Sequence, residues 1–257
     1  MRSILKKIVR RKSPRSGPAQ AWDSELLEGR LAIRSNHQPI GGDCHLFLRV
    51  SSNRVVFAMF DVAGRRPENQ QVVDAVQHAF RSAASRCFAD DEINEADAMV
   101  EICHELNRTI LKTSDRVRVC PAFVGCFNES LGTVSYFNAG HMPGLVVHDG
   151  QLSELNATGL PLGLFSHSTP DAAMVALPPG AALLLVSRGL AEARRKRTEF
   201  GFNQVRDSLL RREQESANDI CKGLLDEVQH FMGNQPIEND VTILALGRSR
   251  RAATAAG

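Results

Sequence analysis

The sequence predicts an α+β fold in which two antiparallel β-sheets pack face to face and helices cover both outer faces. Apolar segments of strand length occur in neighbouring pairs joined by short polar loops, which is typical of hairpins. Two pairs of amphipathic helical segments lie between and after these strands. Strands that pair with strands and helices that pair with helices favour separate, stacked layers.

The first elements are a strand that starts near Leu31 and a hairpin. In the hairpin, the strands Cys44–Val50 and Arg54–Phe60 flank a polar loop at residues 51–53. Val55 to Phe60 are six consecutive apolar residues, rich in β-branched and aromatic types. This second strand is therefore expected to be buried on both faces.

The remaining order is two helices, a group of strands, two helices and a final strand. Apolar residues recur at helical spacing in Pro67–Ser85 and Asp91–Lys112. The later strands are Ala122–Phe127, Gly132–Asn138, Leu145–His148, Ala172–Leu177, Ala181–Ser187 and Val241–Leu246, and a turn at Asp149 and Gly150 follows the third of these. The later helices are Gly201–Glu213 and Ala217–Met232. No internal repeat of fixed period is present.

The composition is that of an ordinary globular domain. Of 257 residues, 43% are hydrophobic and 23% are charged. The net charge of +2 gives no general argument for nucleic acid as a partner. The cysteines show no Cys-x-x-Cys spacing and mostly lie in apolar segments, which favours reduced thiols in a cytoplasmic protein. No apolar segment reaches the roughly 18 residues that a membrane-spanning helix needs.

The two ends of the chain differ from the domain predicted at residues 21–247. Residues 1–20 carry seven Lys and Arg residues and no acid, and their few apolar residues fall at helical spacing. A disordered basic arm is the favoured interpretation, and weak contact of this arm with an anionic membrane surface is the alternative. Residues 248–257 are predicted to be a disordered tail.

Asp61 stands at the end of the buried strand and is followed by a small turn, Ala63-Gly64. A carboxylate in this position needs a cation or a hydrogen-bond network, because burial of an unpaired charge is unfavourable. It is either a metal-binding or catalytic group, or a carboxylate that caps the helix that follows. From this strand alone, the two interpretations are about equally supported.

A second acid, Asp43, follows paired glycines at the start of the preceding strand. In an antiparallel hairpin with a short loop, the outer ends of the two strands meet, so Asp43 and Asp61 are expected to lie together. Two converging carboxylates are the beginning of a site for a hard cation.

Six motifs, in order, resemble the SpoIIE-like branch of the metal-dependent (PPM) serine/threonine protein phosphatases. They are Gly41-Gly42-Asp43 with Asp61-Val62-Ala63-Gly64, Asn138-Ala139-Gly140-His141-Met142-Pro143, Gly159-Leu160-Pro161-Leu162-Gly163, Ser187-Arg188-Gly189-Leu190-Ala191-Glu192-Ala193, Glu199-Phe200-Gly201, and Asn239-Asp240-Val241-Thr242. The resemblance spans roughly Leu31 to Gly247 and implies a four-layer α-β-β-α sandwich.

The resemblance also implies a site for two Mn²⁺ or Mg²⁺ ions that activate a water for attack on a phosphoserine. Asp61 would bridge both ions, Val62 would offer its backbone carbonyl and Asp43 would contribute from the neighbouring strand. Two further aspartate ligands are expected at the positions of Arg188 and Asn239.

At those two positions the sequence departs from the family pattern. Arg188 is a permanent cation that cannot coordinate a metal, and Asn239 offers only a neutral carbonyl oxygen. The family's Gly-His-Gly is replaced here by Gly64-Arg65-Arg66. We expect Arg188, with a contribution from Arg65, to meet Asp61 and Asp43 bidentately in place of the metals.

The same motifs leave two neighbouring residues open to interpretation. Asp240 would keep a single metal if the final strand slipped by one residue, which would require a bulge. His141 is a landmark of the family, although a buried, hydrogen-bonded histidine is the better expectation than a catalytic base.

The resulting hypothesis is a pseudophosphatase: a cytoplasmic, catalytically impaired domain with no metal or a weakly bound one. The resemblance implies a regulatory binding module in a bacterial partner-switching pathway. Its partner would be a phosphorylatable protein, such as an anti-sigma antagonist-like protein. The alternatives are an active, divergent phosphoserine phosphatase that uses Mn²⁺ or Mg²⁺, and a structural subunit with a vestigial groove.

Overall fold

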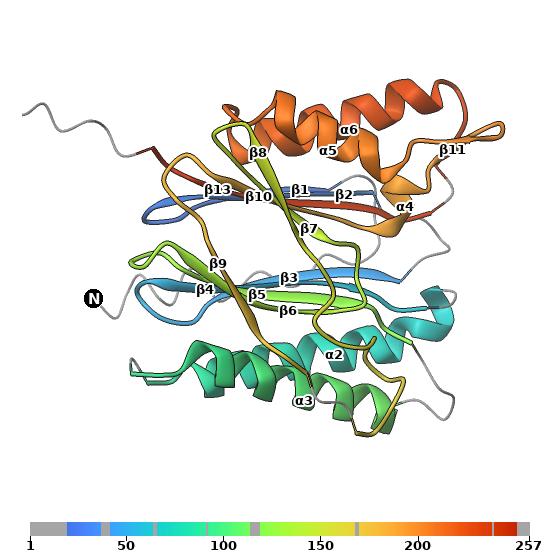
Figure 1. The fold of residues 1–257 in the computed structure, drawn as a ribbon. Helices are drawn as coiled ribbons and strands as arrows, with labels where there is room; N and C mark the ends of the chain where they lie inside the picture. The colour runs from blue at the N-terminus through green and yellow to red at the C-terminus, as the bar shows by residue number, and fades with distance from the viewer. Residues whose placement is uncertain are drawn as a thin grey trace, which may run out of the picture.

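The protein is described by a computed structural model that covers residues 20–36, 42–63, 66–90, 92–113, 119–167, 170–237 and 239–250. Within these residues the chain forms two antiparallel sheets between two helical layers (Figure 1). The predicted fold class, a four-layer α-β-β-α sandwich, is confirmed. Residues 1–19 and 251–257, which hold most of the predicted arm and tail, lie outside this description.

One sheet has six strands in the order β1-β2-β13-β10-β7-β8. These strands are β1 (Gln20–Glu25), β2 (Gly29–Asn36), β13 (Val241–Arg248), β10 (Ala182–Val186), β7 (Gly144–His148) and β8 (Gln151–Leu155). Every neighbouring pair in it is antiparallel. The first and last segments of the described chain are therefore close in space, with β13 beside β2.

The other sheet has five strands in the order β3-β4-β5-β6-β9. These are β3 (Asp43–Arg49), β4 (Arg54–Asp61), β5 (Ala122–Asn128), β6 (Thr133–Ala139) and β9 (Ala173–Ala176). The hairpin of β3 and β4 forms at the predicted place, with Phe47 opposite Phe57. The predicted full burial of β4 is found, since Val55 to Phe60 are all buried.

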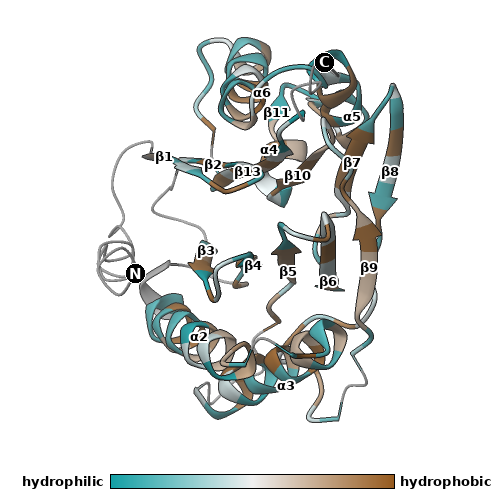
Figure 2. Cartoon of the chain, turned by 90° about the vertical axis from the view of Figure 1, so that its left-hand side faces the viewer, coloured by the Kyte–Doolittle hydropathy of each residue, from teal (hydrophilic) through white to brown (hydrophobic). Residues whose placement is uncertain are grey.

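Each sheet is covered by one pair of helices. Helices α2 (Arg66–Cys87) and α3 (Glu95–Thr113) cover the five-stranded sheet, and α5 (Phe202–Arg211) and α6 (Ala217–Met232) cover the six-stranded sheet (Figures 1 and 2). A Ser216 side chain caps the start of α6 by accepting a hydrogen bond from the Asp219 N–H. Among the described helices, none is long and apolar enough to cross a membrane.

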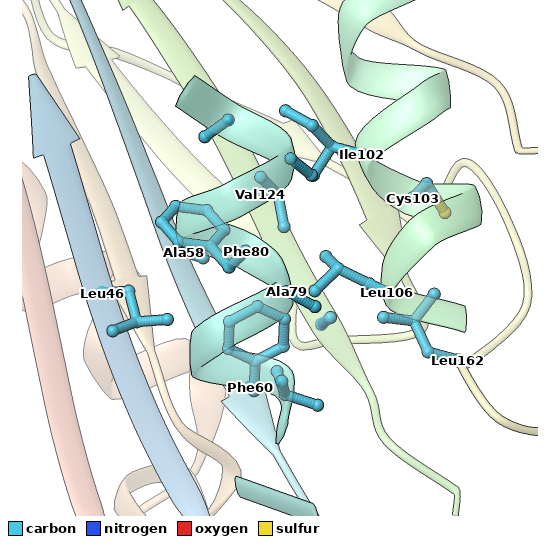
Figure 3. Packing of buried hydrophobic residues seen from close by; sticks show 14 of the residues in the cluster. Leu46, Ala58, Phe60, Ala79, Phe80, Ile102, Cys103, Leu106, Val124 and Leu162 are labelled. Carbon is cyan, nitrogen blue, oxygen red and sulfur yellow. The ribbon is translucent and has the colours of Figure 1, made fainter. Parts of the chain in front are cut away.

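Apolar side chains fill three layers of core. The side chains between α2, α3 and the five-stranded sheet include Phe60, Phe80 and Leu106 (Figure 3). Phe57 and Phe123 belong to the core between the two sheets. A third core lies between the six-stranded sheet and α5 and α6. Because β4 contributes to two of these cores, both of its faces must be apolar.

Several strands were not predicted, and all of them are polar or short. β1 and β8 are edge strands whose solvent-facing sides weaken the apolar alternation on which strand prediction depends. The charged stretch at residues 194–197 contributes to a small hairpin of β11 (Arg194–Arg195) and β12 (Thr198–Glu199). At the domain edges, β1 begins at Gln20 and β13 ends at Arg248, one residue beyond each predicted boundary.

Candidate functional site

Asp43 and Asp61 lie opposite each other at one end of the five-stranded sheet. They are register partners at the open end of the β3–β4 hairpin. Asp43 is buried, whereas Asp61 is partly exposed. The loop length fixes this pairing, because only four residues, 50–53, connect two strands of similar length and so place their outer ends side by side.

Arg188 joins this pair from the six-stranded sheet. It begins the short helix α4 (Arg188–Ala191) directly after β10, and its Nη2 donates a hydrogen bond of 2.9 Å to Asp61 Oδ2. The hydrogen bond with Asp61 and the charge of that carboxylate raise the pKa of Arg188. The side chains of Arg188 and Asp61 are 51% and 19% exposed. An ion pair this open to water contributes roughly 1 kcal/mol or less to stability.

The expected bidentate bridge from Arg188 to both acids is wrong. Among the carboxylates of the described residues, the Arg188 guanidinium donates a hydrogen bond to that of Asp61. Asp43 is held by different hydrogen bonds. Thr242 Oγ1 donates to Asp43 Oδ2 at 2.9 Å, and the Asp43 N–H donates to Asp240 Oδ2 at 3.1 Å. Arg65 and Gly64 lie outside the described residues.

The surroundings of Asp43 disfavour its charged form. The pKa of Asp43 is raised to about 8, mainly by burial and then by the negative charges of Asp61 and Asp240, although hydrogen bonds from Ser187 and Thr242 lower it. At neutral pH this carboxyl group is therefore largely protonated. Ser187 and Thr242 belong to the motifs found in the sequence but were not predicted as site residues; their polar side chains at the buried ends of β10 and β13 were the available signal.

Asn239 and Asp240 lie beside the turn that carries Arg188. Asn239 is exposed, and Asp240 is buried with its carboxylate directed to the backbone of β3. The backbones approach so closely here that a Cβ on Gly189 would lie 2.1 Å from the Asp240 carbonyl oxygen. Glycine is thus required where α4 packs on the start of β13.

The backbone carbonyl of Val62 has a partner from helix α2. Asn69 Nδ2 donates to Val62 O at 3.0 Å, and the Val62 N–H donates to Gly42 O at 3.1 Å. Asn69 is fully buried. This asparagine was not predicted from the sequence, because a single polar residue in the first turns of a helix carries no clear signal.

His141 is buried at the end of β6, next to the same site. Its backbone N–H donates to Asn138 Oδ1 at 2.8 Å, and its ring Nδ1 lies 3.1 Å from Met142 O. Burial lowers the pKa of His141, so the ring is neutral at physiological pH. These contacts fit the expected hydrogen-bonded histidine.

The geometry therefore brings the retained acids and the substituted positions to one end of the sandwich. Across the described parts of the chain, no group of three or more His, Cys, Asp or Glu side chains is arranged to hold a metal ion. A sandwich of two antiparallel sheets flanked by helices, with acids at the strand ends, defines the class of PPM (PP2C-type) phosphatase folds.

The chain belongs to the SpoIIE family within this class. The sequence model described as Stage II sporulation protein E (SpoIIE) matches residues 51–249. Protein IcfG of Synechocystis sp. is 25% identical over 175 residues, which make up 66% of this chain and 27% of IcfG. The chain thus spans about a quarter of the length of this relative.

Solved structures share the fold. The SiaA-PP2C domain of Pseudomonas aeruginosa has a TM-score of 0.68 at 16% identity, over 84% of this chain and 85% of that one. The RsbU and RsbW domains of Rv1364c from Mycobacterium tuberculosis have a TM-score of 0.69 at 23% identity, over 85% and 60%. SpoIIE from Bacillus subtilis has a TM-score of 0.66 at 16% identity, over 92% and 66%.

Proposed function

We propose that this domain is a pseudophosphatase: a PPM-type fold that binds a protein partner and has lost efficient metal-dependent hydrolysis. One observation carries the proposal. The guanidinium of Arg188 forms an ion pair with Asp61, the acid that would bridge two metals in the resembling family. A fixed positive charge 2.9 Å from that carboxylate repels a dication and takes up the oxygen that would bind it.

The other potential ligands are also engaged or changed. Asp240 accepts a hydrogen bond from the Asp43 backbone, Val62 O accepts one from Asn69, and Asn239 carries no charge. Two adjacent divalent ions do not fit this arrangement, because each needs several free oxygen ligands. The structure of RsbX, which has the same fold at 13% identity, was solved in complex with magnesium.

We propose a regulatory role in partner switching for this domain. The solved structures with a similar fold include the RsbU and RsbW domains of Rv1364c, and a structure from work on the bacterial stressosome. We propose a phosphorylatable protein, such as an anti-sigma antagonist-like protein, as the partner. A cytoplasmic location fits the six free cysteines of the described chain.

A second candidate function is weak hydrolysis with a single Mn²⁺ or Mg²⁺. The observation that favours it is that Asp61 and Asp240 lie close to Asp43, whose pKa is raised to about 8 by burial first and then by these two negative charges. A cation bound there would relieve this repulsion. Asp61 would first have to exchange its hydrogen bond with Arg188 for the metal.

Calorimetric titration with MnCl₂, together with hydrolysis of p-nitrophenyl phosphate, tests the proposal. We expect no Mn²⁺-dependent turnover above background from the unmodified protein. Arg188→Asp combined with Asn239→Asp should increase Mn²⁺ affinity at least tenfold, because it removes a cation and adds two carboxylates at the end of the sandwich that carries Asp61. Affinity is the primary readout, since residues 65 and 66 also differ from the family pattern.

The matched control is Arg108→Asp combined with Asn156→Asp, which makes the same change of net charge at exposed positions away from the site. This variant should leave Mn²⁺ affinity unchanged. Robust Mn²⁺-stimulated turnover by the unmodified protein, abolished by Asp61→Asn, would replace the pseudophosphatase by the single-metal or two-metal enzyme.

A further inference from the structure

The small hairpin of β11 and β12 projects beside the end of the sandwich that carries Arg188 (Figure 1). Two residues separate it from α4, and a hydrogen bond of 2.8 Å from the Phe200 backbone N–H to Ala193 O closes its base. Four consecutive basic residues, 194–197, are exposed on it. The hairpin therefore presents a dense positive charge next to the candidate site.

Two of these four cations are held in place and two are free to bind. Arg194 forms an ion pair with Glu199, and Arg195 Nη1 donates to Phe231 O at 3.2 Å. No carboxylate in the described chain pairs with Lys196 or Arg197 at the hairpin tip. Lys196 has a φ of 59°, a conformation that glycine would adopt with less strain, so its side chain is kept at a conformational cost.

A groove runs between this hairpin and helices α5 and α6. It has a volume of about 670 Å³ and is lined by Arg195, Phe200, Gln204, His230 and Phe231, among others. The rings of Phe200 and Phe231 meet edge to face with centroids 5.6 Å apart. The groove thus offers the partly exposed ring of Phe231, packed on the buried ring of Phe200, at the base of the basic hairpin.

The acids of the groove are unevenly distributed. Glu227 is neutralised by Arg211 and Arg212, whose guanidinium nitrogens lie 3.2 and 2.8 Å from its carboxylate. Asp226 lines the groove and is exposed, with no ion pair among the described residues. The hairpin is the positive end of the groove, so an occupant with acids at one end has a preferred direction.

We propose that this groove binds an acidic segment of a partner protein that also carries one large apolar side chain. The acids pair with Lys196 and Arg197, and the apolar side chain contacts Phe200 and Phe231 in the groove. Charge complementarity selects this occupant, because two unpaired cations lie at the tip of the hairpin whose Arg195 lines the groove. The proposal deepens the proposed function, on which it rests for the existence of a protein partner.

Fluorescence anisotropy with a labelled peptide tests the docking surface. The probe is a fluorescein-labelled peptide in which a run of Glu is followed by one Phe. The unmodified protein should bind it, and binding should weaken as the ionic strength is raised to about 0.5 M, where surface charges are screened. Peptides with Lys in place of Glu, or Ser in place of Phe, should bind more weakly by about tenfold or more.

Variants of the protein test separately how the charge of the hairpin and the shape of the groove contribute to peptide binding. Lys196→Glu with Arg197→Glu should weaken binding at least tenfold, and Gln204→Trp should do so by filling the groove from an exposed position. The matched control is Arg108→Glu with Lys112→Glu, which makes the same change of charge on exposed positions of α3. Circular dichroism checks that each variant is folded.

Three outcomes would overturn the proposal. The first is that the acidic peptide does not bind, and the second is that the control variant loses as much peptide affinity as the hairpin variant. The third is that phosphatidylserine vesicles bind in a hairpin-dependent way while the peptide does not, which would make the hairpin a membrane contact. These results leave the metal titration untouched. Conversely, Mn²⁺-dependent turnover would overturn the proposed function whether or not the peptide binds.

Discussion

Asp43 has a carboxyl group in a position where its charge is unfavourable. The group is buried, faces Asp61, and has the carboxylate of Asp240 on its own backbone N–H. A folded state that holds a carboxyl group in this way loses stability when the group ionises. Such arrangements occur at functional sites, where function limits stability.

Asp43→Asn should stabilise the metal-free protein. The pKa of Asp43 is about 8 in the folded chain and near its usual value of 3.8 when unfolded. A raised folded pKa contributes stability that is present below pH 3.8 and is lost as the pH rises to about 8. At pH 7 the amide should therefore raise the free energy of unfolding by up to about 4 kcal/mol.

Urea denaturation between pH 4 and pH 8 measures this effect. The unmodified protein should lose stability across the window more steeply than the Asp43→Asn variant. The control is Asp207→Asn at an exposed position of α5, which should follow the unmodified protein. Parallel pH profiles for Asp43→Asn and the unmodified protein would show that this carboxyl group ionises freely in the folded state.

At the scale of elements, Glu95 connects the start of helix α3 to three strands. Its carboxylate accepts hydrogen bonds from Arg54 Nε at 2.7 Å, Asn128 Nδ2 at 2.7 Å and Ser135 Oγ at 3.0 Å. The residue is the first of α3, where a negative charge is favourable. The side chains of Arg54 and Glu95 are only 12% and 8% exposed.

Glu95→Ala should destabilise the protein by about 3 kcal/mol or more, because it leaves Arg54 as an unpaired buried charge. Glu101→Ala on the same helix is the matched control. Glu101 pairs with Arg86 at 3.5 Å, both side chains are about half exposed, and its removal should change the free energy of unfolding by less than about 0.5 kcal/mol. Equal effects in urea denaturation would show that Glu95 only packs against the sheet.

At the scale of the whole molecule, the two sheets approach each other through a core that depends on Gly125. This residue of β5 is opposite Phe57 of β4. A Cβ added to Gly125 would lie 2.5 Å from Phe57 Cζ, inside the ring's van der Waals surface. The Phe57 ring fills the space that the glycine leaves, in the core between the sheets.

Gly125→Ala should therefore lower the stability of the entire sandwich by about 1–3 kcal/mol through overpacking. A second substitution, Phe57→Leu, should recover part of this loss in the double variant because it shortens the clashing side chain. Gly159→Ala, where the nearest atom to the new Cβ is 3.9 Å away, should cost less. Thermal unfolding measures all four proteins, and an unchanged midpoint for Gly125→Ala would contradict this account of the core.

The sequence by itself determined the layers, because they depend on local periodicity. The apolar run Val55–Phe60 had to be buried on both faces, and α6 was predicted with its observed bounds, Ala217–Met232. The meeting of Asp43 and Asp61 also followed from one hairpin. Ordered motifs were enough to predict the family that the comparisons show.

Only the tertiary structure decided which charges meet. The hydrogen bond from Arg188 to Asp61 joins residues that are 127 positions apart and belong to different sheets. The carboxylate of Asp240 accepts a hydrogen bond from the backbone of Asp43 in β3, 197 positions away. Edge strands such as β8 were not predicted, because one of their sides faces water and their apolar residues are therefore few. Periodicity records which face of an element is buried, whereas side-chain pairing between elements depends on how the two sheets pack, a property that no local pattern contains.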